Sequence, residues 1–145
     1  MTVPAAGTNA RPRRIGRSIV ALLLGFLAVV VLSTVTDLVL HAMNVYPAPN
    51  QPMIEPGLVL LALTYRCAYG ILGSFIAARL APHSPMRHAM ILGFVGLVIS
   101  SVGVIAATRV NLGPLWYPIA LALTTLPCAW LGGLLHRVTI LGREA

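Results

Sequence analysis

The sequence contains no lysine and little charge of any kind. Only 9% of its 145 residues are charged and three are acidic, whereas 58% are hydrophobic. A soluble domain carries about 25% charged residues, so this chain cannot cover a water-facing surface. Its arginines lie mostly at the ends of apolar runs. That placement is typical of contact with a lipid bilayer, so no nucleic-acid partner is predicted.

Cysteine is also scarce, and the usual motifs of catalysis and metal binding are missing. Cys67 and Cys128 both fall inside apolar runs, without a CxxC pair or a Cys/His cluster of zinc spacing. His83 and His88 flank one short loop with no carboxylate nearby. We therefore expect no metal and no cofactor, and we interpret the two cysteines as small packing residues.

The chain is instead rich in apolar runs long enough to span a bilayer, which takes about 20 helical residues. The predicted helices cover about 17–43, 56–80, 86–108 and 115–136. The first run exceeds the apolar core of about 7–15 residues that a signal peptide needs, so it is predicted to stay as a membrane anchor. The prolines of the segment 47–56 forbid one continuous helix there.

This pattern predicts an all-α membrane protein with a single four-transmembrane-helix bundle over residues 17–137. Residues 1–16 are predicted to form a disordered basic N-terminal tail, and residues 138–145 a short C-terminal tail. With both termini in the cytoplasm, the inner side carries eight arginines and the outer side only Arg109. The positive-inside rule therefore predicts that both termini are cytoplasmic.

One acidic residue, Asp37, is predicted to lie within the membrane. A charge near the bilayer centre costs roughly 2.5–3.5 kcal/mol on insertion scales, so it needs a partner, water or a proton. Ser33 and His41 share its helix face at spacings of four residues. Arg66 interrupts the second predicted helix at a depth that its long side chain can bridge. We therefore predict an ion pair between Asp37 and Arg66.

The predicted intramembrane polar site also includes residues near this pair. Its members are Asp37, His41, Arg66, Tyr65 and Tyr69. Two interpretations remain open for these residues. The pair is either a structural contact that sets the register of the first hairpin, or a binding site for an anion or a proton that opens to the outer face.

Small residues recur along the helices and predict close helix packing. The glycines chosen on this ground are Gly73, Gly93, Gly96 and Gly103. The two hairpins also look alike, because Cys67-Ala68-Tyr69 in the second helix has a counterpart, Cys128-Ala129-Trp130, in the fourth. Either the bundle consists of two tandem hairpins in parallel repeat, or the likeness is chance similarity between Leu/Ala-rich helices.

Several stretches carry a resemblance to other proteins. They are Thr36–His41 with Tyr46-Pro47, Ala77–Pro82 followed by Pro85–Ala89, Gly113–Pro118, and Ala129–Gly133. Together they resemble an uncharacterised family of small four-span bacterial inner-membrane proteins. The resemblance implies four spans and a location in the bacterial inner membrane. It implies no activity, so no functional residue is transferred from it.

These observations predict a non-enzymatic integral membrane protein. It would be a subunit or assembly partner of a larger complex, or a small oligomeric carrier with a polar site in the outer half of the membrane. The expected partners are the lipid bilayer and either further copies of the chain or another membrane protein. The alternative is a membrane-embedded enzyme that acts on a lipid or quinone in the outer half, using Asp37 and His41.

The predicted topology is tested by cysteine labelling in a variant without native cysteines. A membrane-impermeant thiol reagent should label Asn50→Cys in intact cells, and Ser84→Cys only after the membrane is permeabilised. The reverse pattern would show that the termini face outward.

Overall fold

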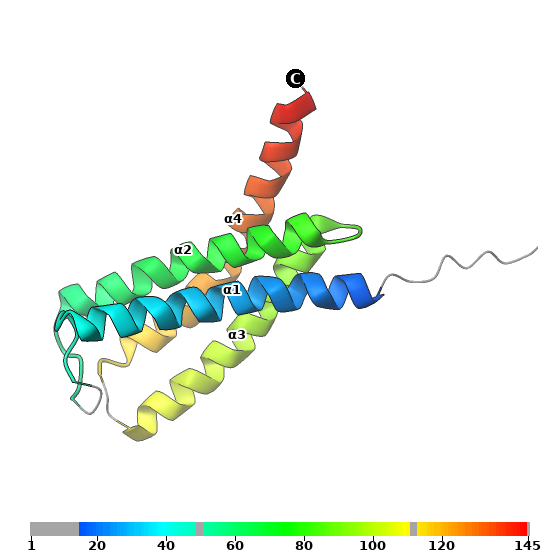
Figure 1. The fold of residues 1–145 in the computed structure, drawn as a ribbon. Helices are drawn as coiled ribbons and strands as arrows, with labels where there is room; N and C mark the ends of the chain where they lie inside the picture. The colour runs from blue at the N-terminus through cyan, green and yellow to red at the C-terminus, as the bar shows by residue number, and fades with distance from the viewer. Residues whose placement is uncertain (1–14, 49–50, 111–112, 145) are drawn as a thin grey trace, which may run out of the picture.

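The computed structural model describes residues 15–48, 51–110 and 113–144 and shows a bundle of four α-helices (Figure 1). The helices are α1 (Ile15–Ala42), α2 (Pro56–Leu80), α3 (Pro85–Val110) and α4 (Trp116–Glu144). All four are long and apolar enough to cross a membrane. The predicted all-α class and the four-helix bundle are therefore confirmed.

One predicted boundary is wrong. Residues 138–145 were predicted to form a C-terminal tail, but α4 continues to Glu144. After the polar pair His136-Arg137 the sequence returns to apolar residues, and no glycine or proline interrupts the helix before Gly142. At the other end, Ile15 and Gly16 belong to α1, and the rest of the predicted N-terminal tail lies outside the described residues.

The helix α2 has a central position, since it packs against α1, α3 and α4. Within the described residues, α1 and α4 do not contact each other. One contact between α1 and α3 lies at Gly25 and Leu92. From there the C-terminal half of α3 diverges from α1 (Figure 1). The divergence leaves a cleft that is lined by α1 and α3, with α2 and α4 behind it.

The contact between α1 and α2 brings two helix backbones together. A Cβ atom built on Gly25 would lie 2.6 Å from the carbonyl oxygen of Gly73 and 2.9 Å from Cβ of Ala77. No side chain larger than hydrogen fits between these backbones without a shift. Gly73 thus lies at a helix contact, where a small residue allows close approach.

Two of the three glycines chosen in α3 face α4. A Cβ on Gly93 would collide with Cβ of Ala129, and a Cβ on Gly96 would lie 2.8 Å from Cγ2 of Thr125. The prediction that Gly103 lies at a helix contact is wrong, because a Cβ there would meet nothing within 4 Å. It lies on the diverging half of α3, where the helix no longer packs closely, and it lines a cavity instead.

The two hairpins, α1–α2 and α3–α4, both form, but their glycine contacts differ in register. Gly25 in α1 meets Gly73 in α2. Gly93 in α3, which like Gly25 precedes a phenylalanine, meets Ala129 in α4. In the predicted repeat, Ala129 corresponds to Ala68 and not to Gly73. The repeat stays a prediction, and its two copies would pack with different offsets.

The glycine contacts predict which positions of α3 tolerate a larger side chain. Gly93→Leu should lower stability by about 1–3 kcal/mol, the usual cost of overpacking a tight contact, because Ala129 occupies the space. Gly103→Leu is the matched control, since it places the same side chain on the same helix in open space. Thermal aggregation in detergent measures both variants. Equal stability of the two would contradict the α3–α4 contact.

Candidate functional site

The last turn of α1 folds the following segment back over the site. Asn44 has a φ of 55°, in the left-handed region that asparagine tolerates better than most residues. The N–H groups of Asn44 and Val45 donate to the carbonyls of His41 and Leu40, the pattern of a Schellman cap. This turn places Tyr46 against the helices, where it is only 6% exposed.

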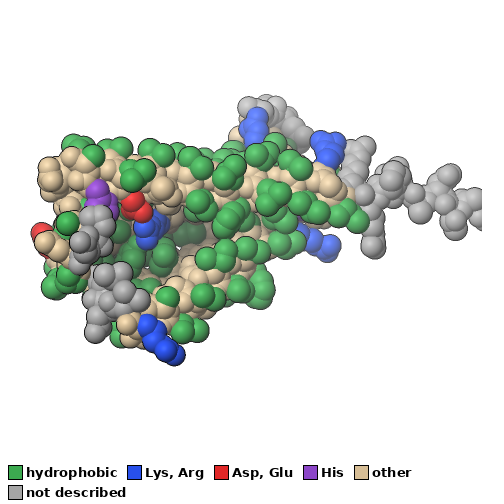
Figure 2. Space-filling view, turned by 60° about the horizontal axis from the view of Figure 1, so that its bottom comes forward, with side chains coloured by type: hydrophobic (Ala, Val, Ile, Leu, Met, Phe, Trp, Pro, Cys, Tyr) green, Lys and Arg blue, Asp and Glu red, His purple; other side chains and the backbone are tan. Residues whose placement is uncertain are grey.

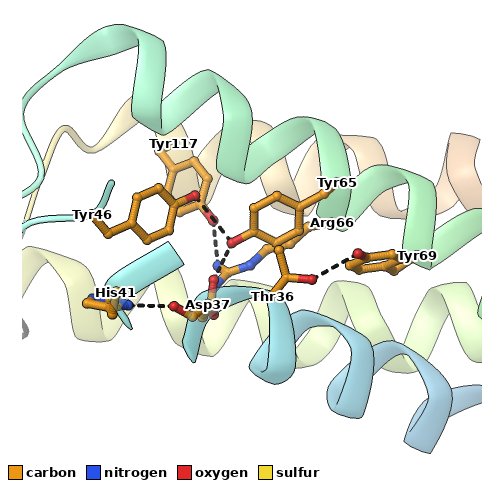
Figure 3. Close-up of polar contacts among 8 residues, drawn as sticks. All are labelled: Thr36, Asp37, His41, Tyr46, Tyr65, Arg66, Tyr69 and Tyr117. Atoms are coloured by element: carbon orange, nitrogen blue, oxygen red, sulfur yellow. Dashed lines mark hydrogen bonds and ion pairs between the residues drawn. The ribbon is translucent and has the colours of Figure 1, made fainter. Parts of the chain in front are cut away.

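The centre of the site is the ion pair between α1 and α2. Nη2 of Arg66 donates to Oδ2 of Asp37 at 2.7 Å (Figure 3). Each charge has an opposite charge beside it, which offsets the cost of placing either one in an apolar surrounding. Both side chains are 29% exposed, so the pair borders open space instead of being sealed in a core.

Tyrosine hydroxyls complete the surroundings of the carboxylate. The hydroxyl of Tyr65 donates to Oδ1 of Asp37, and the hydroxyl of Tyr46 donates to that of Tyr65 at 3.4 Å (Figure 3). Both carboxylate oxygens therefore have a donor. Asp37 is held in one orientation by two donors of α2, and Tyr46 from the segment after α1 in turn donates to one of them, Tyr65.

Arg66 also reaches α4. Its Nη1 donates to the hydroxyl of Tyr117, which lies in the first turn of that helix. The guanidinium carbon lies 5.9 Å from the ring centroids of both Tyr65 and Tyr117, within cation–π range. A guanidinium has five N–H donors, and the described residues accept from two of them.

The other two predicted members, His41 and Tyr69, flank the pair. Nδ1 of His41 lies 2.7 Å from the backbone carbonyl oxygen of Asp37, and its ring packs edge-on against Tyr46. Tyr69 shares a hydrogen bond with Thr36 at 2.9 Å. Within the described residues, neither ring bonds to the carboxylate, so the geometry does not favour a catalytic Asp37–His41 couple.

Sequence reasoning missed two members of the site. Tyr46 and Tyr117 were not among the predicted site residues, yet their hydroxyls belong to the network around Asp37 and Arg66. Their place at the end of the bundle where α1 ends and α2 begins was a usable signal. Their contacts were not predictable, because they depend on the turn at Asn44 and on the packing of α4 beside α2.

Three cavities meet at Arg66, which alone among the described residues lines all of them. The entrance cavity, of about 180 Å³, lies at the end of the bundle near Tyr46 and includes Asp37 and His41. The cleft cavity, of about 160 Å³, lies between α1 and α3. The side cavity, of about 320 Å³, lies between α3 and the start of α4, and it shares Ser100 with the cleft cavity.

The face formed by α1 and α3 is visibly hollowed. Figure 2 shows the hollow beside an adjoining acidic and basic side chain, with hydrophobic side chains along both edges. In a bilayer this face would contact lipid. Of the ion pair, Arg66 lines the cleft cavity on this face, and Asp37 lines the neighbouring entrance cavity.

The chemistry available at the site is hydrogen bonding and charge. Within the described residues, no group of three or more His, Cys, Asp or Glu is placed to hold a metal ion. Comparison of the chain with protein-family models, curated proteins and solved structures finds no match. Any functional conclusion therefore depends on the geometry around Arg66.

The ion pair predicts coupled effects of mutation. Asp37→Asn and Arg66→Leu should each destabilise the protein, because each strands a charge. In soluble proteins this costs roughly 3–5 kcal/mol, and we expect less here because arginine can snorkel toward water. The double variant should recover part of the loss, with a coupling energy of about 0.5–3 kcal/mol in thermal denaturation in detergent.

A matched cycle gives the control for this coupling. Asp37→Asn combined with Arg109→Leu should be additive, because Arg109 lies at the exposed end of α3. Additivity in both cycles would show that Asp37 and Arg66 do not interact.

Proposed function

We propose that this chain is an integral protein of the bacterial inner membrane that binds a small anionic group at Arg66 and works as a carrier, with no catalytic step of its own. One observation carries the proposal. The guanidinium of Arg66 lines three cavities, while the described residues accept from two of its five donors. Arginine's planar fork of donors matches carboxylate and phosphate groups.

The distribution of arginines supports the orientation of this carrier. The described arginines at the end where α1 begins and α2 ends are Arg17, Arg79, Arg87 and Arg137, against Arg109 at the opposite end. The positive-inside rule then puts both termini in the cytoplasm. In that orientation the Asp37–Arg66 pair lies in the outer half of the membrane, and the entrance cavity faces the outer side.

Asp37 acts in this proposal as an internal counter-ion. In the absence of ligand it neutralises Arg66, which keeps the empty site compatible with an apolar surrounding. An incoming anion competes with the carboxylate for the same guanidinium. A proton on Asp37 would weaken that competition, so anion binding and proton uptake would favour each other.

The bundle also leaves large faces for lipid or for partners. Within α1 only Ala21 and Gly25 are buried, and most of the large apolar residues of the helix are exposed. We propose that the bilayer covers most of this surface. Further copies of the chain or another membrane protein would cover the remainder, since one four-helix bundle rarely encloses a path by itself.

Anion binding is tested with benzoate and inorganic phosphate on the purified protein in non-ionic detergent. Trp116 is the reporter in a Trp130→Phe background, because its ring contacts that of Tyr117. Arg66→Gln should abolish the saturable change in fluorescence. Asp37→Asn removes the competing carboxylate and should tighten binding about tenfold, equivalent to roughly 1.4 kcal/mol.

Two further variants keep this test decisive. Arg109→Gln removes an exposed arginine from outside the site and should bind like the parent. The double variant Asp37→Asn/Arg66→Gln leaves no unpaired charge, so it should be folded and still fail to bind. Saturable binding that survives the loss of Arg66, or that Arg109→Gln weakens equally, would contradict the proposal.

A further inference from the structure

The cleft cavity has a hydroxyl lining that helix packing does not require. Ser33 from α1, Ser74 from α2 and Ser100 from α3 all line it. Within the described residues, none of these three hydroxyls makes a hydrogen bond. Ser74 is only 3% exposed. Among the described residues no fully buried side-chain polar atom lacks a partner, so these unbonded hydroxyl oxygens are accessible from the cavity. A hydroxyl that faces an apolar medium without a partner is costly, so the cleft is lined to receive polar atoms.

Six other hydroxyls of the helices behave differently. Those that donate to a backbone carbonyl three or four residues earlier belong to Thr64, Ser101, Thr108, Thr124, Thr125 and Thr139. Such back-bonding, from a hydroxyl to an earlier backbone carbonyl, is the usual way in which serine and threonine hydroxyls find a hydrogen-bond partner within a membrane helix. Thr124 and Thr125 also line the cleft cavity, but their hydroxyls are already bonded to backbone carbonyls. The three serines differ because their hydroxyls face this cavity without a hydrogen-bond partner among the described residues.

The lining extends deep along the bundle. Arg66 is the eleventh and Ser74 the nineteenth of the 25 residues of α2. At ~1.5 Å per residue these positions lie ~15 and ~27 Å from the start of a helix ~37 Å long. Polar atoms therefore continue from the entrance cavity, past Arg66, to within ~9 Å of the opposite end of α2.

The cleft also has apolar walls and an open side. Phe26 and Val29 of α1 face Leu92 and Gly96 of α3 across it. Figure 2 shows the hollow on the face that α1 and α3 present to the bilayer. A molecule in this cleft could keep an apolar chain among the lipids while its polar group contacts the serines. A purely soluble anion would leave the apolar walls and the open side unfilled.

We propose that the ligand is an amphiphile with an anionic headgroup and an acyl chain, and that the cleft lets the headgroup cross the bilayer while the chain stays in lipid. This inference rests on the proposed anion-binding function and names its ligand class. Arg66 receives the headgroup from the entrance cavity. Ser100, Ser33 and Ser74 then replace water as its hydrogen-bonding partners.

Polar side chains also lie on α2 and α4 beyond the end of the cleft. A Cβ on Gly132 of α4 would lie 2.7 Å from Cβ of Ser74, so α4 packs closely against α2 at this depth. One turn further along α4, His136 is buried and packs edge-on against Phe75. Arg79 lies on the next turn of α2 after Phe75, near the end of that helix.

The test is lipid transfer in proteoliposomes that contain a trace of NBD-labelled phosphatidylglycerol. Dithionite destroys the label in the outer leaflet only, so bleaching in empty vesicles stops when that leaflet is consumed. With the wild-type protein, bleaching should continue until the inner leaflet is also consumed, and it should be slower with labelled phosphatidylcholine. A soluble dye trapped inside the vesicles must keep its fluorescence, which excludes leakage of dithionite.

The serines have a matched control. The triple variant Ser33→Ala/Ser74→Ala/Ser100→Ala should slow transfer about tenfold or more, because each lost hydrogen bond raises the barrier for the headgroup. The triple variant Thr64→Ala/Ser101→Ala/Thr139→Ala removes exposed, back-bonded hydroxyls and should transfer lipid like the wild type. Cys67 lines the cleft, so a bulky maleimide on it, in a Cys128→Ala background, should block transfer.

The outcomes separate this inference from the proposed function. Benzoate or phosphate binding with bleaching that stops as in empty vesicles would overturn the inference and leave anion binding in place. Uptake of radioactive phosphate without lipid transfer would assign the cleft to a soluble anion and overturn the amphiphile. Equal transfer rates for the two triple variants would show that the cleft serines are not the route.

Discussion

The ion pair between Asp37 and Arg66 is the interaction on which the rest of this structure depends. The bilayer core offers no water to solvate either charge, so each needs the other or a strong donor. The pair ties α1 to α2 within their apolar spans, and Tyr117 extends the connection to α4. Three helices are thus positioned around one guanidinium. The guanidinium has further N–H donors that are not used on these partners. The pair is therefore a candidate binding site as well as a structural contact.

Backbone proximity provides the second constraint. Where glycine meets glycine or alanine, as in Gly25 with Gly73 and Gly93 with Ala129, the helices are held close. Gly103 has no such partner, and the half of α3 that contains it diverges from α1. The tight contacts and the open cleft are therefore two results of the same distribution of small residues. A uniformly tight bundle would have no room for a ligand beside Arg66.

The polar site combines residues that were predictable with residues that were not. Asp37 and Arg66 stood out because an ionisable residue inside an apolar run needs an explanation, and two antiparallel neighbours at similar depth provide one. Tyr65 and His41 were placed beside them by helical spacing. Tyr46 and Tyr117 were not, because one depends on the turn at Asn44 and the other on which helix packs beside α2. The predicted end of α4 was also wrong, because the polar pair His136-Arg137 resembled the end of a helix.

The sequence by itself determined the class of protein, the number of candidate spans and the two charged residues that were expected to form an ion pair. These follow from one-dimensional properties: the length of apolar runs, the position of prolines and the rarity of acids. The tertiary structure alone decided that three serines from three helices line one cleft and that Arg66 lies where three cavities meet. Such a meeting depends on the crossing and divergence of whole helices. Those are set by many weak packing contacts between residues far apart in the chain, which no local pattern records.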